Sequence, residues 1–171
     1  MVFLLNRFFD AIVPAITGAG GTIDKYLGDG LLAVFKAPGP HPSAQAALEA
    51  ATAIGTALER FNAQLASEGE GPVRIGIGLH LGELVLGEIG SAAHAPTTII
   101  GDSVNTASRL EAQTKPLQVE LLVSAQLLAA AGYAPERFAL QQMRLRGVSD
   151  SLAALPVQQA AALPRILAAA R

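Results

Sequence analysis

The order of helix-period and strand-period segments constrains the fold of this chain more than any other feature. Apolar residues recur about once per helical turn over residues 2–18 and again from Ala44 to Leu65, which predicts two long amphipathic helices. Short apolar runs bounded by glycine and proline lie between and after them, and such runs are typical of strands. Helices interleaved with hairpin-forming strands predict an α+β domain in which helices cover a mostly antiparallel sheet.

The same patterns predict the remaining elements. We expect a hairpin over 22–36, strands at 73–79, 83–86, 97–100, 119–123, 137–145 and 152–158, a loop at 87–96, helices at 102–114 and 124–131, and a short alanine-rich helix at the end. Residues 1–158 then form one domain, followed by a C-terminal tail over 159–171. An open ferredoxin-like sheet usually begins with a strand that becomes central, whereas this chain begins with a helix.

Composition excludes several classes of protein. Apolar residues make up 51% of the 171 residues, so the chain can bury a sizeable core. The net charge of −2 differs from the strongly positive charge typical of a nucleic-acid-binding protein. The low aromatic content, 5%, argues against an RNA-binding domain that stacks bases on aromatic side chains. The absence of cysteine excludes disulfides and thiolate metal sites, and no apolar stretch reaches the roughly 18 residues of a membrane span. We expect a cytoplasmic domain.

One polar cluster surrounds the sequence Gly28-Asp29-Gly30. An Asp-Gly pair between two strand-like runs predicts a hairpin with Asp29 at its tip. Lys25 precedes this turn, and strand alternation predicts that Asp24 and Lys25 point to opposite faces. Taken alone, an aspartate at this place can serve only to shape the turn.

Two further clusters lie at other element ends. Asn105 and Arg109 are four residues apart on an expected helix and therefore share one face, although a merely solvated face would show the same pattern. The run 144–147, Arg-Leu-Arg-Gly, is a basic strand end that could be plain surface. The histidines lack the spacing of a metal site.

The chain resembles the catalytic domain of class III adenylate and guanylate cyclases in four segments that recur in order and with compatible spacing: GGTIDKYLGDGLLAVFKAP, VRIGIGLHLGELVLGEIGS, TTIIGDSVNTASRLEAQTK and LLVSAQL. The resemblance runs from residue 1 to about residue 158. It implies a ferredoxin-like nucleotide cyclase fold and the conversion of ATP into 3′,5′-cyclic AMP and pyrophosphate. It also implies two Mg²⁺ or Mn²⁺ ions and a site shared by the two chains of a homodimer.

The resemblance gives a role to six residues of this sequence: Asp29 holds a metal ion, Lys25 and Thr98 read the adenine, Asn105 positions the ribose, Arg109 contacts the α-phosphate, and Arg146 stands where a lysine usually binds the terminal phosphates. Lys25 paired with Thr98 favours ATP over GTP. The metal aspartates would come from one protomer and the lysine, threonine, asparagine and arginine from the other.

One part of the family pattern is absent. The family's first strand, which carries the other metal aspartate, should precede residue 1, and Asp10 in the opening helix cannot replace it. We therefore expect a truncated cyclase, because the other catalytic positions are present, or else a naturally degenerate one.

Turnover by this chain alone should be small, and exposed sheet edges would favour a homodimer or a domain-swapped assembly. An upstream sensor domain is a further expected partner. The alternative is a non-catalytic cyclase-like module that dimerises or binds nucleotide for regulation.

Overall fold

The computed structural model describes residues 2–88, 97–144 and 151–170, and its elements follow the expected order. They are α1 Val2–Gly18, β1 Thr22–Leu27, β2 Gly30–Val34, α2 Pro40–Ser67, β3 Ile77–Leu79, β4 Val85–Glu88, β5 Thr97–Ile100, α3 Asp102–Leu117, β6 Leu121–Ser124, α4 Ala125–Ala130, η1 Pro135–Arg137, β7 Gln141–Met143, β8 Leu152–Val157, η2 Ala160–Ala162 and α5 Leu163–Ala169. The prediction of an α+β fold with a mostly antiparallel sheet is confirmed, because every described strand pairing except that of β3 with β6 is antiparallel.

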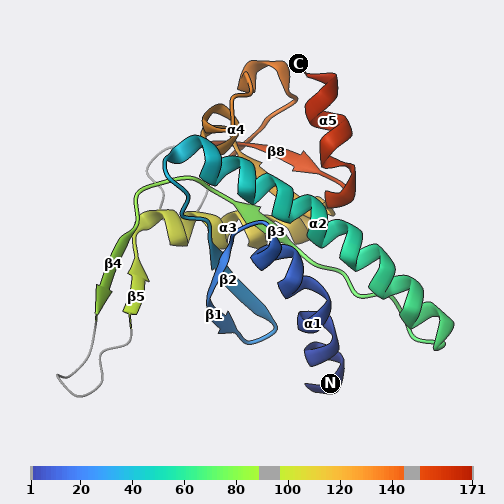
Figure 1. Cartoon of the computed structure of the whole chain (residues 1–171). Helices are drawn as coiled ribbons and strands as arrows, with labels where there is room; N and C mark the ends of the chain where they lie inside the picture. The colour runs from blue at the N-terminus through green and yellow to red at the C-terminus, as the bar shows by residue number, and fades with distance from the viewer. Residues whose placement is uncertain (1, 89–96, 145–150, 171) are drawn as a thin grey trace.

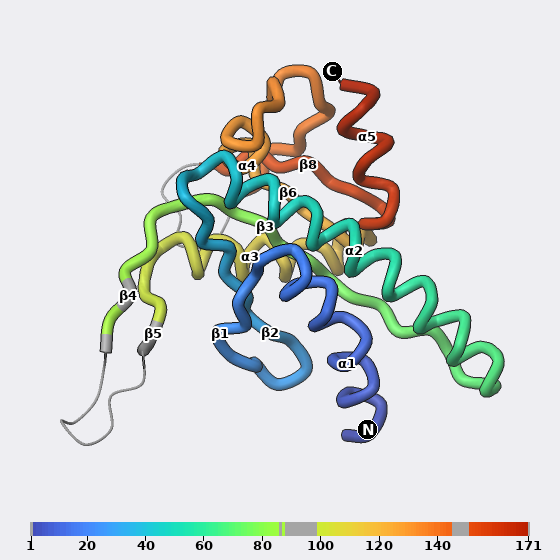
Figure 2. Tube along the Cα trace, viewed as in Figure 1, coloured from blue at the N-terminus to red at the C-terminus, as the bar shows by residue number. Residues whose placement is uncertain are grey.

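The central sheet has helices on both of its faces (Figure 1). Its strand order is β3-β6-β8-β7. Leu121 and Val123 of β6 point into a core formed with α2, α4 and α5, whereas Leu122 between them packs against Leu110 of α3. This alternation is the two-residue period of a strand buried on both faces. The sheet therefore separates a layer containing α2, α4 and α5 from a layer made by α3 (Figure 2).

Helices α1 and α2 form a second core with the β1–β2 hairpin. Phe8 of α1 packs edge-on against Phe61 of α2 with ring centroids 5.9 Å apart. Arg7 donates two hydrogen bonds, of 2.8 and 2.7 Å, to the carboxylate of Glu68 at the end of α2. Ile23 of β1 packs against the same cluster, so the hairpin presents one face to the two helices.

The hairpin and the central sheet share this core but not a hydrogen-bond ladder. Leu31 and Ala33 of β2 and Ile77 of β3 all pack against the cluster of α1 and α2. The hairpin is nevertheless a separate two-stranded sheet, and β3 is an edge strand of the central one. Among the described strands, β2 and β3 each have one edge without a strand partner. Helices α1 and α2 therefore cover both the hairpin and β3, although these are not hydrogen-bonded to each other.

Helix α3 approaches β3 so closely that a side chain has no room between them. A Cβ atom on Gly78 would lie 2.5 Å from the backbone nitrogen of Glu111 and closer still to the carbonyl oxygen of Ala107. A Cβ atom on Gly76, just before β3, would lie 2.9 Å from Oε1 of Glu111. The glycines of this segment therefore fix the depth at which α3 sits on the sheet.

The C-terminal segment packs onto the rest of the chain. Leu163 is fully buried in the core with α2 and α4, and Ala160 is equally inaccessible. Gly55 of α2 allows this contact, because a Cβ there would lie 2.8 Å from the carbonyl carbon of Ala160. Pro164 occupies the first turn of α5, where its missing N–H costs no helical hydrogen bond.

Two strands are shorter than expected. The predicted strand over 73–79 is hydrogen-bonded only at Ile77–Leu79. Of the predicted strand over 137–145, residues 137–144 are described, and these are hydrogen-bonded only at Gln141–Met143. The reason is the same in both cases, because a neighbouring strand is present only along that part. Among the residues that the structure describes, no helix is both long and apolar enough to cross a bilayer.

Replacing Gly78 by alanine tests the contact between β3 and α3. We expect Gly78→Ala to lower the free energy of unfolding by about 1–3 kcal/mol, the usual cost of overpacking a core. Urea denaturation followed by circular dichroism measures this change. Gly71→Ala is the control, because a Cβ at Gly71 meets nothing within 4 Å, and it should change stability little. Equal stabilities of the two variants would contradict the packing argument.

Candidate active site

The β1–β2 hairpin places Asp29 at its tip, as the sequence predicts. Leu27 pairs with Gly30, so Gly28 and Asp29 form a two-residue turn. Gly28 has a φ of 64°, which a glycine adopts at little cost at the first position of such a turn. The turn therefore lies one residue earlier than the Asp-Gly pair alone suggests. Asp29 is exposed, and its carboxylate is free to meet a ligand.

A bulge in β1 determines where Lys25 points. Ile23 pairs with Ala33 and Lys25 pairs with Leu32, so Asp24 is an extra residue in the ladder. Ile23 packs on the helical core, and Tyr26 stacks edge-on against Phe9 of α1 with centroids 4.9 Å apart. Ile23 and Tyr26 thus share the helix-facing side, which leaves Asp24 and Lys25 together on the other.

The prediction that Asp24 and Lys25 point to opposite faces is therefore wrong. Oδ2 of Asp24 lies 3.5 Å from Nζ of Lys25. Strict alternation fails here because the bulge inserts one residue without a partner, and every side chain after it changes face.

Asn105 and Arg109 lie one turn apart on α3. Thr106 and Leu110, the residue after each of them, are buried at 7% and 0% exposure and fix the helix against the sheet. Asn105 is exposed and Arg109 is half-buried. Within the part of the chain that the structure describes, neither side chain forms a hydrogen bond or an ion pair, so both polar groups can turn to a ligand.

Glu111 brings a second carboxylate into the neighbourhood of Asp29. Partial burial of its carboxyl beside Gly76 raises the pKa of Glu111, and the negative charge of Asp29 raises it further. The hairpin tip and α3 are therefore electrostatically coupled. The sequence motifs do not single out Glu111. The signal that could have found it is its position two residues after Arg109, on a helix packed against a glycine-containing strand.

For the two remaining predicted site residues, Thr98 and Arg146, the structure describes less. Thr98 lies in β5, where its backbone pairs with Gly87 of β4. Arg146 lies outside the described residues. Lys25 of the hairpin and the pair Asn105 and Arg109 of α3 come from separate elements, and their convergence on one ligand stays a prediction.

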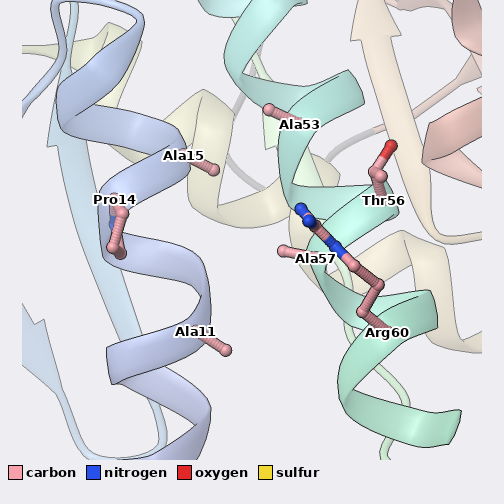
Figure 3. Close-up of a pocket in the computed structure, with 7 residues that line it drawn as sticks. All are labelled: Ala11, Pro14, Ala15, Ala53, Thr56, Ala57 and Arg60. Carbon is pink, nitrogen blue, oxygen red and sulfur yellow. The ribbon is translucent and has the colours of Figure 1, made fainter.

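Two surface hollows lie away from these residues. A groove of about 450 Å³ between α1 and α2 is lined by small side chains and one cation: Ala11, Pro14, Ala15, Ala53, Thr56, Ala57 and Arg60 (Figure 3). A second hollow, of about 440 Å³, lies between α1 and Tyr26 on the helix-facing side of the hairpin. Neither contains a predicted site residue.

Asp29 has the chemistry of a ligand for a divalent ion. Mg²⁺ is usually held by one or two carboxylates together with phosphate oxygens of a substrate, and an exposed Asp29 can supply such a ligand. Over residues 2–88, 97–144 and 151–170, however, no three histidine, aspartate or glutamate side chains converge. The role of Asp29 as a metal ligand therefore stays a prediction.

Comparison with known proteins identifies the family. The model of the adenylate and guanylate cyclase catalytic domain matches residues 1–151. The chain belongs to this family. The resemblance inferred from the four sequence segments is thereby confirmed.

Individual cyclases show the same relationship. An adenylate cyclase of Anabaena cylindrica is 32% identical over 162 residues, which are 90% of this chain and 31% of that protein. The crystal structure of the guanylyl cyclase Cya2 superposes with a TM-score of 0.77 at 31% identity, covering 91% of this chain and 79% of that one. The adenylyl cyclase CyaB from P. aeruginosa gives a TM-score of 0.75 at 25% identity, covering 90% and 79%. This cyclase domain spans less than a third of the length of the curated relatives it matches.

The carboxyl of Glu111 should make the stability of this cyclase domain depend on pH. Because its pKa is raised in the fold, the unfolded chain loses this proton first as pH rises, and the folded state is then penalised. The stabilising contribution of protonated Glu111 is complete below its ordinary value near 4.5 and disappears as pH passes the raised value. We expect Glu111→Gln to be as stable as the parent chain at low pH and more stable at pH 8.

Chemical denaturation across this pH range measures the difference. Asp29→Asn is the companion variant, since removing its charge should narrow the pH range over which stability falls. Parallel pH profiles for the parent chain and Glu111→Gln would show that folding does not raise the pKa of Glu111.

Proposed function

We propose that this chain is the catalytic core of an adenylate cyclase that converts ATP into 3′,5′-cyclic AMP and pyrophosphate. A bond forms between the ribose 3′ oxygen and the α-phosphorus while the 3′ hydroxyl loses its proton to solvent. The bond from that phosphorus to the oxygen bridging to the β-phosphate breaks, and pyrophosphate leaves. The observation that carries the proposal is the pair Asn105 and Arg109 on an anchored helix, with polar groups that no described neighbour occupies.

Arg109 would stabilise the charge that develops on the α-phosphate. Leu110 beside it is fully buried, so the backbone that carries the guanidinium is fixed. A group held in place where charge develops needs no reorganisation during the reaction, and one such donor is commonly worth about a hundredfold or more in rate. Asn105, one turn earlier, would orient the ribose, and Arg146 would bind the terminal phosphates.

Lys25 and Thr98 would select adenine over guanine. An ammonium group only donates hydrogen bonds, and N1 of adenine accepts one, whereas N1 of guanine carries a proton. A threonine hydroxyl can accept from the 6-amino group of adenine. Because both an adenylate cyclase and a guanylyl cyclase are among the similar proteins, the nucleotide is a proposal carried by these two residues.

Asp29 would hold Mg²⁺ or Mn²⁺ as one carboxylate ligand. Such an ion, when bound, offsets negative charge on the phosphates and lowers the pKa of a coordinated hydroxyl. Asp29 suits this role because it stands exposed on a two-residue turn that paired strands hold rigid.

In the proposed arrangement two copies of the chain share the site, so that each substrate meets residues of both. Asp29 would serve one substrate together with Lys25, Asn105 and Arg109 of a second copy. A homodimer then has two sites, and an isolated chain has only half of each.

Turnover by this chain alone should be small. Two-ion catalysis requires a second metal carboxylate in addition to Asp29. Glu111 is an acidic residue near Asp29, and the charge of Asp29 raises the pKa of its carboxyl group. The family's other metal aspartate is expected on a strand, and the unpaired edges of β2 and β3 are where a strand could be added. These edges also favour the second candidate function, a cyclase-like module that dimerises or binds nucleotide without catalysis.

Replacing Arg109 tests the proposed reaction. The purified chain is incubated with radiolabelled ATP or GTP and Mn²⁺, and the cyclic nucleotide is separated and counted. We expect slow formation of cyclic AMP, a slower reaction with GTP, and a loss of about a hundredfold in Arg109→Ala, the effect of removing one preorganised donor. Arg60→Ala, on the exposed side of α2, is the matched control and should leave the rate unchanged.

Three results would change this assignment. Equal rates for Arg109→Ala and Arg60→Ala would remove Arg109 from the reaction. Fast cyclic AMP formation by the parent chain would contradict the need for a further metal carboxylate. Nucleotide binding and dimerisation with no cyclic nucleotide formed would establish the non-catalytic module.

Mixing two defective variants tests whether the site is shared. Asp29→Asn and Arg109→Ala should each be inactive as homodimers, because both sites lose one group. In a mixed dimer one site carries both defects and the other is intact, so random mixing should restore about a quarter of the parent rate. Activity that stays at the level of the separate variants, in mixtures shown to exchange subunits, would place all groups within one chain.

A further inference from the structure

We propose that Asp24 is a positioning residue that holds the ammonium group of Lys25 and thereby sets the choice of purine. This inference rests on the proposed function, in which Lys25 reads the base. It adds a residue that strand alternation alone assigns to the wrong face of the hairpin.

The first step of the argument is the bulge in β1. It places Asp24 and Lys25 on the same side of the hairpin, as the shared helix-facing side of Ile23 and Tyr26 requires. Adjacent residues of a regular strand cannot bring their side chains together in this way. The extra residue is therefore what makes the 3.5 Å approach of Oδ2 to Nζ possible.

The second step is the burial of the carboxylate. The side chain of Asp24 is 12% exposed, whereas that of Lys25 is 42% exposed. Oδ2 of Asp24 is buried and forms no hydrogen bond. A buried acceptor without a partner is costly, so a nearby cation that offsets this cost is strongly favoured. Lys25 is the cation that the described residues place within ion-pair distance of it.

The third step is what this attraction does to a base-reading lysine. The side chain of a free lysine has many rotamers, and its ammonium group can follow any acceptor within reach. It could donate to N1 of adenine, but equally to O6 of guanine. A carboxylate oxygen 3.5 Å from the ammonium nitrogen attracts this group by its charge and so restricts the positions that the group can take. Asp24 therefore adds selectivity by limiting the positions of the ammonium group rather than by touching the base.

Nucleotide competition tests this without requiring turnover. A fluorescent ATP derivative, with a methylanthraniloyl group on the ribose, is bound to the full chain in Mn²⁺ and displaced by ATP or by GTP. The ratio of the two inhibition constants is compared for the parent chain, Asp24→Asn, Lys25→Met and the double variant. Asn keeps the shape and one oxygen acceptor of Asp24 but removes its charge. Asp10→Asn, an exposed residue of α1, is the control for loss of a carboxylate.

We expect Asp24→Asn to lower the preference for ATP over GTP about tenfold and Asp10→Asn to leave it unchanged. In the background of Lys25→Met, Asp24→Asn should have no further effect on the ratio, because residues that act as one unit show non-additive changes. A merely structural role would instead weaken ATP and GTP binding alike and would lower the unfolding temperature in both backgrounds.

The possible failures are distinguishable. If Lys25→Met changes the ratio but Asp24→Asn does not, or if the two changes add, the positioning role is overturned while the cyclase proposal stands. If Lys25→Met leaves the ratio unchanged, or if the parent chain binds neither nucleotide, the proposed reading of the base is wrong and the inference falls with it.

Discussion

The contact between α3 and β3 determines the geometry of the candidate site. Gly78 lets the helix backbone reach the strand backbone, so that a Cβ would lie 2.5 Å from the nitrogen of Glu111. Leu110 then packs with Leu122 on the same face of the sheet. A helix that is held against the sheet both through its backbone and through a buried leucine has little freedom to rotate. The positions of Asn105, Arg109 and Glu111 follow directly from this constraint.

The polar groups of the hairpin depend on a second constraint, the extra residue in β1. Without it, Lys25 would share the helix-facing side with Ile23, and its ammonium group would point toward an apolar core. Burial of an unpaired charge there would be expensive. The bulge instead gives that side to Tyr26 and places Lys25 and Asp24 together on the opposite side of the hairpin. The inserted residue thus keeps the charge of Lys25 out of the apolar core and places it beside Asp24.

The sequence predicts those parts of the fold that local periodicity and turn chemistry determine. The helices α1, α2 and α3 and the tip of the hairpin agree with the expected ranges, because each depends on residues close in sequence. The bulge at Asp24 was missed, because its cause lies in pairing with β2 and in the packing of Tyr26 against Phe9, which alternation within one strand does not contain.

Predictions were less accurate where a structure depends on residues far away in the sequence. A strand of seven residues at 73–79 became three, because only Ile77–Leu79 has a neighbouring strand. Glu111 was missed for a related reason, since its altered environment comes from the hairpin tip and from Gly76 rather than from its own helix. The family motifs supplied the six candidate residues, and the fold adds two acidic neighbours, Asp24 beside Lys25 and Glu111 near Asp29.

Exposed apolar side chains near the predicted site support its completion by a second chain. Tyr26 and Leu27, which precede the turn of Asp29, are both 55% exposed, and Val85 and Ile100, which face each other across β4 and β5, are 64% and 47% exposed. Large apolar groups at the ends of strands are common where another protein packs. Thr98 lies on the same strand, β5, as Ile100. A partner that covered the β4–β5 pair would therefore also exclude water from a base bound beside Thr98. The desolvation that strengthens the hydrogen bonds of Lys25 would then come from the partner rather than from a pocket within one chain.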